Sequence, residues 1–233
     1  MDFWTGLLQS MLQVAISPTT AAFALAAIGL NLHFGFTGLM NMGQAGFMLV
    51  GAYGFAISIT NGLPFGMAVL VALLVAIVFA IILGIPTLRL RGDYLAIVTI
   101  SGAEIIRMVG RSSLLTTTTG GSNGLVVPRP FPDLLRPVHH QVFFYLFAAL
   151  LAVMLLLWWA INRSRFGIGL KAIREDEDKA EALGIPTRNY KLVAYVISAT
   201  FTGLAGGMYA LWFGDLDPIF QFSILLGSYM VLM

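Results

Sequence analysis

Charge is the most conspicuous absence from this sequence. No Asp, Glu, Lys or Arg occurs between Asp2 and Arg89, and of the 233 residues only 10% are charged whereas 58% are hydrophobic. An ordinary soluble domain has about 25% charged and about 45–50% apolar residues. The composition therefore excludes a water-soluble fold for most of the chain. It predicts an all-α integral membrane protein, a bundle of several transmembrane helices.

Cysteine is also absent, which excludes disulfides, thiolate metal sites and cysteine nucleophiles. Nucleotide hydrolysis needs a Gly-rich loop that ends in Gly-Lys-Ser/Thr, and the Gly cluster at residues 120–124 lacks the lysine. The histidines His33, His139 and His140 have no acidic residue at metal-ligand spacing. We therefore expect this chain to carry no catalytic residue, no metal and no cofactor.

The net charge of +2 does not indicate a nucleic-acid partner, because the basic residues lie between apolar segments rather than on one folded face. Seven of them fall within residues 162–191, and Arg89 and Arg91 share another turn. Short loops rich in Lys and Arg stay in the cytoplasm. We therefore predict that both segments are cytoplasmic. Residues 112–140 are then outside, as is the N-terminus if residues 39–60 cross the membrane fully.

Apolar segments of about 20 residues, the length that crosses a bilayer, divide the chain into spans. Pro64 suits a first helical turn, and Pro86 is predicted to end the same helix. The expected spans are residues 8–32, 39–60, 64–85, 93–110, 142–161 and 190–213, with a seventh that begins near Ile219. This last span is apolar up to Met233. We therefore interpret residues 1–233 as one transmembrane domain that is incomplete at its C-terminal end.

The second span is rich in glycine, which allows helices to approach closely, and broken helices in transporters expose backbone groups to substrate. We expect a helix that either spans fully or is broken and partly re-entrant. On a continuous helix Thr37, Asn41 and Gln44 would form one polar stripe, at i, i+4 and i+7. This stripe either holds the bundle together by interhelical hydrogen bonds or lines a substrate path. The glycines of this region are Gly29, Gly35, Gly38, Gly43, Gly46, Gly51 and Gly54.

Glu104 and Arg107 are the charged residues of the fourth span. Three residues apart on a helix, they share a face and can form an ion pair, which lowers the cost of placing either within a membrane. With Arg111 following, the pair can lie at the outer interface as a snorkelling helix end. The alternative is a role in the substrate path.

Residues 162–191 are predicted to hold a short cytoplasmic helix. Acidic residues at positions 175–178 suit a helix N-terminus, where the macrodipole favours anions, and Gly184 followed by Pro186 is a stop signal. Ala180, Ala182 and Leu183 lie between these signals and would form a small apolar surface. We interpret this surface as a docking site for a cytoplasmic partner; the alternative is a solvated, charged connector.

The same loop resembles a known family. The runs FGIGLKAIRED at residues 166–176 and AEALGI at 180–185 are similar to the cytoplasmic loop of permease subunits in ABC importers for branched-chain amino acids. Residues 29–53, RGDYLAIVT at 91–99 and TGGSNGL at 119–125 follow in the family's order. The tyrosine in RGDYLAIVT, Tyr94, makes this chain more similar to M-type than to H-type permeases.

This resemblance implies an importer in the bacterial inner membrane. Its partners would be a second homologous permease, two cytoplasmic subunits that bind ATP and Mg, a periplasmic or extracellular substrate-binding protein, and membrane lipid. Within the coupling loop 162–191, the coupling residues would be Gly167, Gly169, Ala172, Arg174, Glu175, Asp176, Ala180, Ala182, Leu183 and Gly184.

Other functions remain open at this stage. Similar permeases carry urea, short amides or other amino acids, and more distant relatives carry sugars. An ion-coupled secondary transporter, with Glu104 as the ion site, is a further alternative. A membrane enzyme is disfavoured, because no nucleophile–base or paired-carboxylate constellation is found near an interface.

Overall fold

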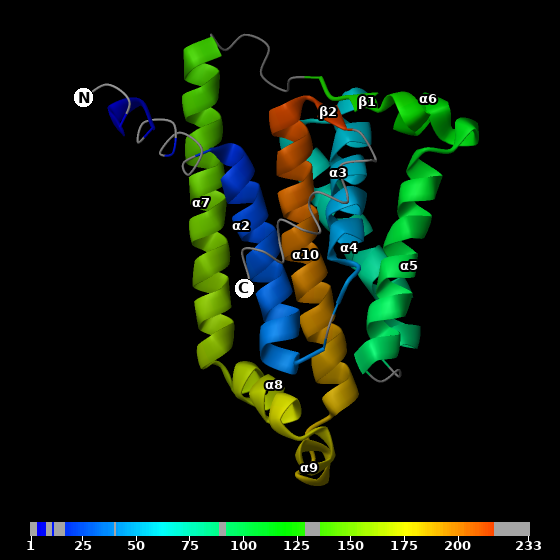
Figure 1. Ribbon diagram of the computed structural model, residues 1–233, viewed down its shortest axis with the longest axis vertical. Helices are drawn as coiled ribbons and strands as arrows, with labels where there is room; N and C mark the ends of the chain where they lie inside the picture. The colour runs from blue at the N-terminus through cyan, green and yellow to red at the C-terminus, as the bar shows by residue number, and fades with distance from the viewer. Residues whose placement is uncertain are drawn as a thin grey trace.

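A computed structural model describes residues 4–7, 11, 17–39, 41–88, 92–128 and 136–216. Its long helices run along one axis and form a bundle (Figure 1), which confirms the predicted all-α membrane fold. These helices are α2 Pro18–Leu30, α3 Gln44–Thr60, α4 Phe65–Thr87, α5 Gly92–Gly110, α7 Arg136–Arg163 and α10 Thr187–Phe213. By length and apolar composition, three described segments can cross a membrane: Phe65–Thr87, Val142–Arg163 and Thr187–Phe213.

Short elements gather at the two ends of the bundle (Figure 1). One end carries η2 Ser113–Leu115, α6 Thr116–Thr119, η3 Gly121–Asn123 and the antiparallel pair β1 Leu125–Val126 and β2 Asp215–Leu216. The opposite end carries α8 Arg165–Glu175 and α9 Glu177–Ala182. The segments predicted to lie outside and in the cytoplasm are thus at opposite ends of the molecule.

This separation allows a direct test of orientation. We expect a reporter inserted within residues 175–180 to read as cytoplasmic and one within residues 120–128 to read as external, because the cationic loop resists translocation. Paired alkaline phosphatase and fluorescent-protein fusions measure the two sides. A third insertion at Gly62, in the turn between α3 and α4, should agree with the external site. The opposite reading at the first two positions would invert the topology.

Helix α10 lies at the centre of the bundle and packs on α2, α3 and α4. Its contact with α3 depends on glycine. A methyl group at Gly206 would overlap the carbonyl oxygen of Met48, and one at Gly51 would overlap the backbone of Gly203. Such close backbone approach replaces large interlocking side chains as the means by which membrane helices pack.

The observed helices differ from the predicted spans in several places. The span predicted at 8–32 is interrupted at Ser17, an extended N-cap whose hydroxyl accepts from the Thr20 amide, and α2 begins at Pro18. Helix α4, the third predicted span, continues through Pro86 to Thr87, so the prediction that Pro86 ends it is wrong. The helix tolerates Pro86 because a proline in the last turn removes only one hydrogen bond. Helix α7 begins at Arg136 rather than at 142. The second span begins at Gln44 rather than at 39. The seventh span, from Ile219, lies outside the described residues.

Candidate functional site: the α2–α3 connection and the α8–α9 helix pair

The Gly-rich segment contains the connection between α2 and α3, which run in opposite directions (Figure 1). The stretch from Gly38 to Gly43 is called the break below. Helix α2 continues into a π-helix, η1 Asn31–Gly35, and helical structure ends at Thr37. The described residues between 38 and 43 are not helical, and α3 begins at Gln44. Gly38 has a φ of 70°, a left-handed conformation that glycine adopts without steric cost. The span predicted at 39–60 therefore begins later than expected, and its helix is continuous from Gln44 to Thr60.

The predicted polar stripe on one continuous helix is therefore wrong, because Thr37 and Gln44 belong to different helical segments. All three residues are nevertheless buried. The Thr37 hydroxyl donates to the carbonyl oxygen of His33 at 2.6 Å. Asn41 lies in the break, where its Nδ2 donates to Gln44 Oε1 at 3.3 Å and its Oδ1 accepts from the Gly43 amide at 2.9 Å.

Gln44 connects the break to the centre of the bundle. Its Nε2 donates to the carbonyl oxygen of Ala26 at 3.3 Å and to the hydroxyl of Thr202. On α10, the Ser198 hydroxyl donates to the carbonyl oxygen of Gly29 at 2.5 Å. Helices α2, α3 and α10 thus share one hydrogen-bond network. Thr202 and Ser198 were not singled out by the sequence, because their partners are remote along the chain.

His33 and Tyr195 form a second feature beside the break. Both side chains are fully buried, and their rings meet edge to face with centroids 4.9 Å apart. Among the described residues, neither His33 ring nitrogen nor the Tyr195 hydroxyl has a hydrogen-bond partner of normal geometry. Burying a polar group without a partner is costly. Two unpaired polar groups, one on η1 and one on α10, therefore lie together in the core beside the break.

Glu104 and Arg107 form the predicted ion pair on α5. Arg107 Nε donates to Glu104 Oε2 at 2.8 Å, and a second guanidinium nitrogen bonds Oε1. The Glu104 side chain is 41% exposed and that of Arg107 is 27% exposed. Within the described chain, no hydrogen bond or ion pair connects them to Thr37, Asn41 or Gln44. The structure therefore places the predicted path residues in two separate groups.

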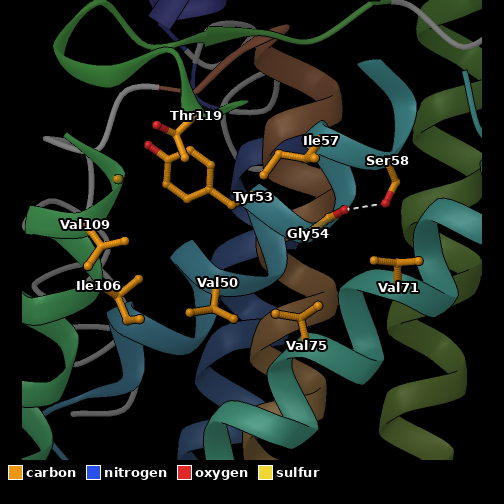
Figure 2. A pocket seen from close by; sticks show the side chains of 11 residues that line it. Val50, Tyr53, Gly54, Ile57, Ser58, Val71, Val75, Ile106, Val109 and Thr119 are labelled. Atoms are coloured by element: carbon orange, nitrogen blue, oxygen red, sulfur yellow. Dashed lines mark hydrogen bonds between the residues drawn. The ribbon is translucent and has the colours of Figure 1, made fainter. Parts of the chain in front are cut away.

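An apolar pocket of about 310 Å³ lies between α3, α4 and α5 (Figure 2). Val50, Val75 and Ile106 come from the three helices, and the Tyr53 side chain lies next to Thr119 at the end nearest α6. The Ser58 hydroxyl is turned to its own backbone and donates to Gly54 O at 2.7 Å. The residues that line this pocket carry no charge. It can hold an aliphatic group but supplies no ion partner for an ammonium or carboxylate.

Helix α8 begins the loop predicted at 162–191 and was not predicted as a separate helix. Ser164 caps it, because its hydroxyl accepts from the Gly167 amide at 3.1 Å. Leu170 and Ile173 are buried; the spacing of Phe166, Leu170 and Ile173, at i, i+4 and i+7, is a helical signal that the sequence offered.

The glycines and Ala172 of α8 are explained by packing within this chain. A Cβ at Gly167 would overlap the carbonyl oxygen of Ile161, and one at Gly169 would lie 2.5 Å from the Tyr190 ring. Both glycines therefore let α8 lie against its neighbours. Ala172 is half-buried on the same helix.

Helix α9 matches the predicted short helix. The Asp176 carboxylate caps its N-terminus by accepting from the Lys179 amide at 3.0 Å, and the Lys179 side chain pairs with it at 2.7 Å. These bonds lower the pKa of Asp176, which keeps the capping group ionised. Glu175 precedes this cap and is exposed.

Gly184 ends α9 in a Schellman motif. Its φ is 85°, its amide donates to the Glu181 carbonyl at 2.9 Å, and the Ile185 amide donates to that of Ala180 at 3.1 Å. The predicted stop signal at Gly184 is therefore observed in detail.

The exposed surface of the pair is smaller than expected. Ala180 is 2% exposed, so its side chain cannot belong to a docking surface as predicted; it faces the protein because α9 packs on α8 and α10. Ala182 is exposed, and Leu183 is 82% exposed at the end of the helix. A buried Lys191 on α10 pairs with Glu177 and holds α9 in place. In the sequence, Lys191 stood out only as a topology signal.

A bundle of apolar helices, several of them long enough to cross a bilayer, defines an integral membrane protein. The chain belongs to the family described as "Branched-chain amino acid transport system / permease component", whose model matches residues 12–233.

Three curated relatives illustrate the range of that family. The chain is 37% identical to the high-affinity branched-chain amino acid transport system permease protein LivM of Escherichia coli K12, over 88% of this chain and 54% of the relative. It is 27% identical to the putative glucose ABC transporter permease protein TsgC13 of Haloferax volcanii, over 93% of this chain and 66% of the relative. It is 26% identical to the guanosine ABC transporter permease protein NupQ of Bacillus subtilis, over 84% and 66%. The chain thus spans about half the length of LivM. No solved structure matches it.

Proposed function

We propose that this chain is the membrane-spanning subunit of an ATP-driven importer for branched-chain amino acids. The α8–α9 pair carries this proposal, because a capped helix with an exposed tip at the end of an apolar bundle is suited to docking a soluble partner. Similarity to LivM supports leucine, isoleucine and valine as substrates. Other amino acids, urea or short amides are the alternative substrates of the same machinery.

The partners follow from this function. A second, homologous permease completes the passage, two cytoplasmic subunits bind ATP and Mg, and a binding protein delivers substrate from the outer side of the inner membrane. The chain itself supplies passage rather than hydrolysis. When the ATP-binding subunits close on nucleotide, they displace α9, whose Asp176 cap and Gly184 motif make it rigid enough to transmit the movement.

We place the substrate path along the break. Thr37, Asn41 and Gln44 are the polar groups there, and their present hydrogen bonds would be exchanged for contacts with substrate as the passage opens. Glu104 and Arg107 belong to an outer part of the same path in this proposal. Their mutual ion pair keeps both charges satisfied while no substrate is present.

Affinity purification from native membranes tests the proposal. We expect the chain to bring down an ATPase subunit that has the phosphate-binding loop. Proteoliposomes with the complete complex should take up leucine, isoleucine and valine only when ATP and binding protein are supplied. Excess urea or acetamide should not compete. Uptake that persists without ATP while an ion gradient remains would favour the secondary transporter instead.

A further inference from the structure

Helix α8 is bonded directly to the end of η1, at the start of the break. The Arg174 guanidinium donates to the carbonyl oxygen of Gly35 at 2.7 Å, although the two residues are 139 positions apart. Arg174 is therefore turned toward the membrane-spanning bundle. Figure 1 shows the same relation between the elements, with α8 lying across the end of α2 and α9 below the end of α10.

The Gly35 carbonyl is available because the helix ends there. In a continuous α-helix it would accept from the amide of Leu39, but that amide faces the Thr37 hydroxyl at 3.4 Å and the chain turns at Gly38. The last carbonyls of a helix lack partners within it, and the negative end of the helix dipole favours a cation. Arg174 supplies both the missing donor and the charge.

Packing reinforces this bond along residues 35–38, where η1 ends and the break begins. Lys171 lies over the Phe36 ring, 5.6 Å from its centroid, and Phe36 packs with the buried Leu170. A Cβ at Gly38 would lie 3.3 Å from Arg174 Cγ. Helix α8 thus holds residues 35–38 by a charge-assisted hydrogen bond, a cation–π contact and apolar packing.

Helix α9 is attached elsewhere. Its Glu177 pairs with Lys191 of α10, and its exposed tip is Leu183. The two helices therefore make different contacts. Helix α9 presents the exposed tip, whereas α8 connects the pair to the break. Since α8 and α9 adjoin at Asp176, a displacement of α9 moves α8 with it.

We propose that Arg174 is a positioning residue that transmits movement of the α8–α9 pair to the helix break at residues 38–43. This inference rests on the proposed function. It gives Arg174 a contact within its own chain, where the family resemblance alone would place it among residues that couple to the ATPase. When α9 is displaced, Arg174 pulls the end of η1 and changes the position of η1 relative to α3.

The test uses the complete transporter with its ATPase subunits and binding protein in proteoliposomes. We expect Arg174→Ala to keep wild-type ATPase subunit stoichiometry while substrate transported per ATP hydrolysed falls about tenfold, the factor that loss of one charge-assisted hydrogen bond typically carries. Arg174→Lys retains the cation without the forked donor, so its ratio of substrate transported per ATP should lie between those of wild type and Arg174→Ala. Arg188→Ala removes an exposed arginine at the same end of the molecule and should leave the transport ratio unchanged.

A second measurement reports the break itself. Because the chain has no cysteine, Leu39→Cys places a single thiol there, and its labelling rate by a water-soluble maleimide can be compared with and without ATP. We expect a several-fold nucleotide-dependent change that disappears when Arg174→Ala is added. The inference is overturned if the labelling rate does not respond to ATP in the parent, if the response survives Arg174→Ala, or if that variant transports normally per ATP. Absence of any ATPase from the parent complex would instead refute the proposed function.

Discussion

Replacing Gly46 with Leu is expected to prevent the subunit from reaching its folded, assembled form. A Cβ at this position of α3 would lie 2.7 Å from Ala103 Cβ and 2.8 Å from its Cα. The obstacle is the backbone of α5, which no change of rotamer can move. Overpacking typically costs about 1–3 kcal/mol and occasionally more. We therefore expect loss of the monodisperse peak after solubilisation, a lower temperature of unfolding and no uptake.

A matched glycine in the next helix controls for the substitution itself. A Cβ at Gly66 of α4 would have no other atom within 4 Å, so Gly66→Leu should behave as wild type. Gly43→Leu should behave as Gly46→Leu does, since a Cβ at Gly43 would lie 2.5 Å from the Thr99 carbonyl oxygen. If Gly43→Leu and Gly46→Leu both assemble and transport as well as Gly66→Leu, close packing at these glycines is not required.

Enlarging Ala182 to Trp should separate the subunit from its ATPase while leaving the bundle intact. Ala182 is exposed at the end of α9 beside Leu183, so the new ring meets the partner rather than the chain's own core. Overfilling a packed contact by about 1–3 kcal/mol corresponds to roughly five- to 150-fold weaker association. ATPase subunit retained on purification and substrate-stimulated ATP hydrolysis are the quantities to measure.

Gly184→Val tests the same helix through its backbone. No atom lies within 4 Å of a Cβ at this position, but its φ of 85° is strained for a β-branched residue, so α9 should lose its end and with it ATPase stimulation. Val126→Trp, at the opposite end of the bundle, is the control for a bulky exposed side chain. Wild-type stimulation and stoichiometry in both Ala182→Trp and Gly184→Val would make the loop a solvated connector.

The sequence predicted the membrane class and the helix pattern because both depend on local composition. The long uncharged stretch between Asp2 and Arg89 is surrounded by lipid or by other parts of the protein rather than by water. In lipid, helices form because they satisfy every backbone hydrogen bond within the segment. Gly184 was predictable for a similar reason: a glycine after a short helix and before a proline has few other uses. Each of these sequence signals lies within about ten residues of the helix, or the helix end, that it predicts.

The remaining features depend on contacts between distant residues. Nothing near Gln44 indicates Thr202 as its partner, and nothing near Leu125 indicates pairing with Leu216, because helix packing brings them together. The interpretation of Ala180 failed for the same reason, since small apolar residues suit a buried and an exposed helix face equally. The sequence placed Arg174 among the coupling residues, but its contact with Gly35 follows only from the position of η1.

The π-helix η1 has a consequence for insertions and deletions in this region. A π-helix closes its hydrogen bonds over five residues instead of four, so it accommodates one residue more than an α-helix of the same height. Removing a single residue within Asn31–Gly35 would let α2 continue as a regular α-helix. The residues after the deletion would keep nearly the same height and orientation, so Phe36 and Thr37 would still face α8. In the regular part of α2, by contrast, a deletion would rotate everything after it by about 100°. A one-residue deletion should therefore be tolerated better within Asn31–Gly35 than within Pro18–Leu30.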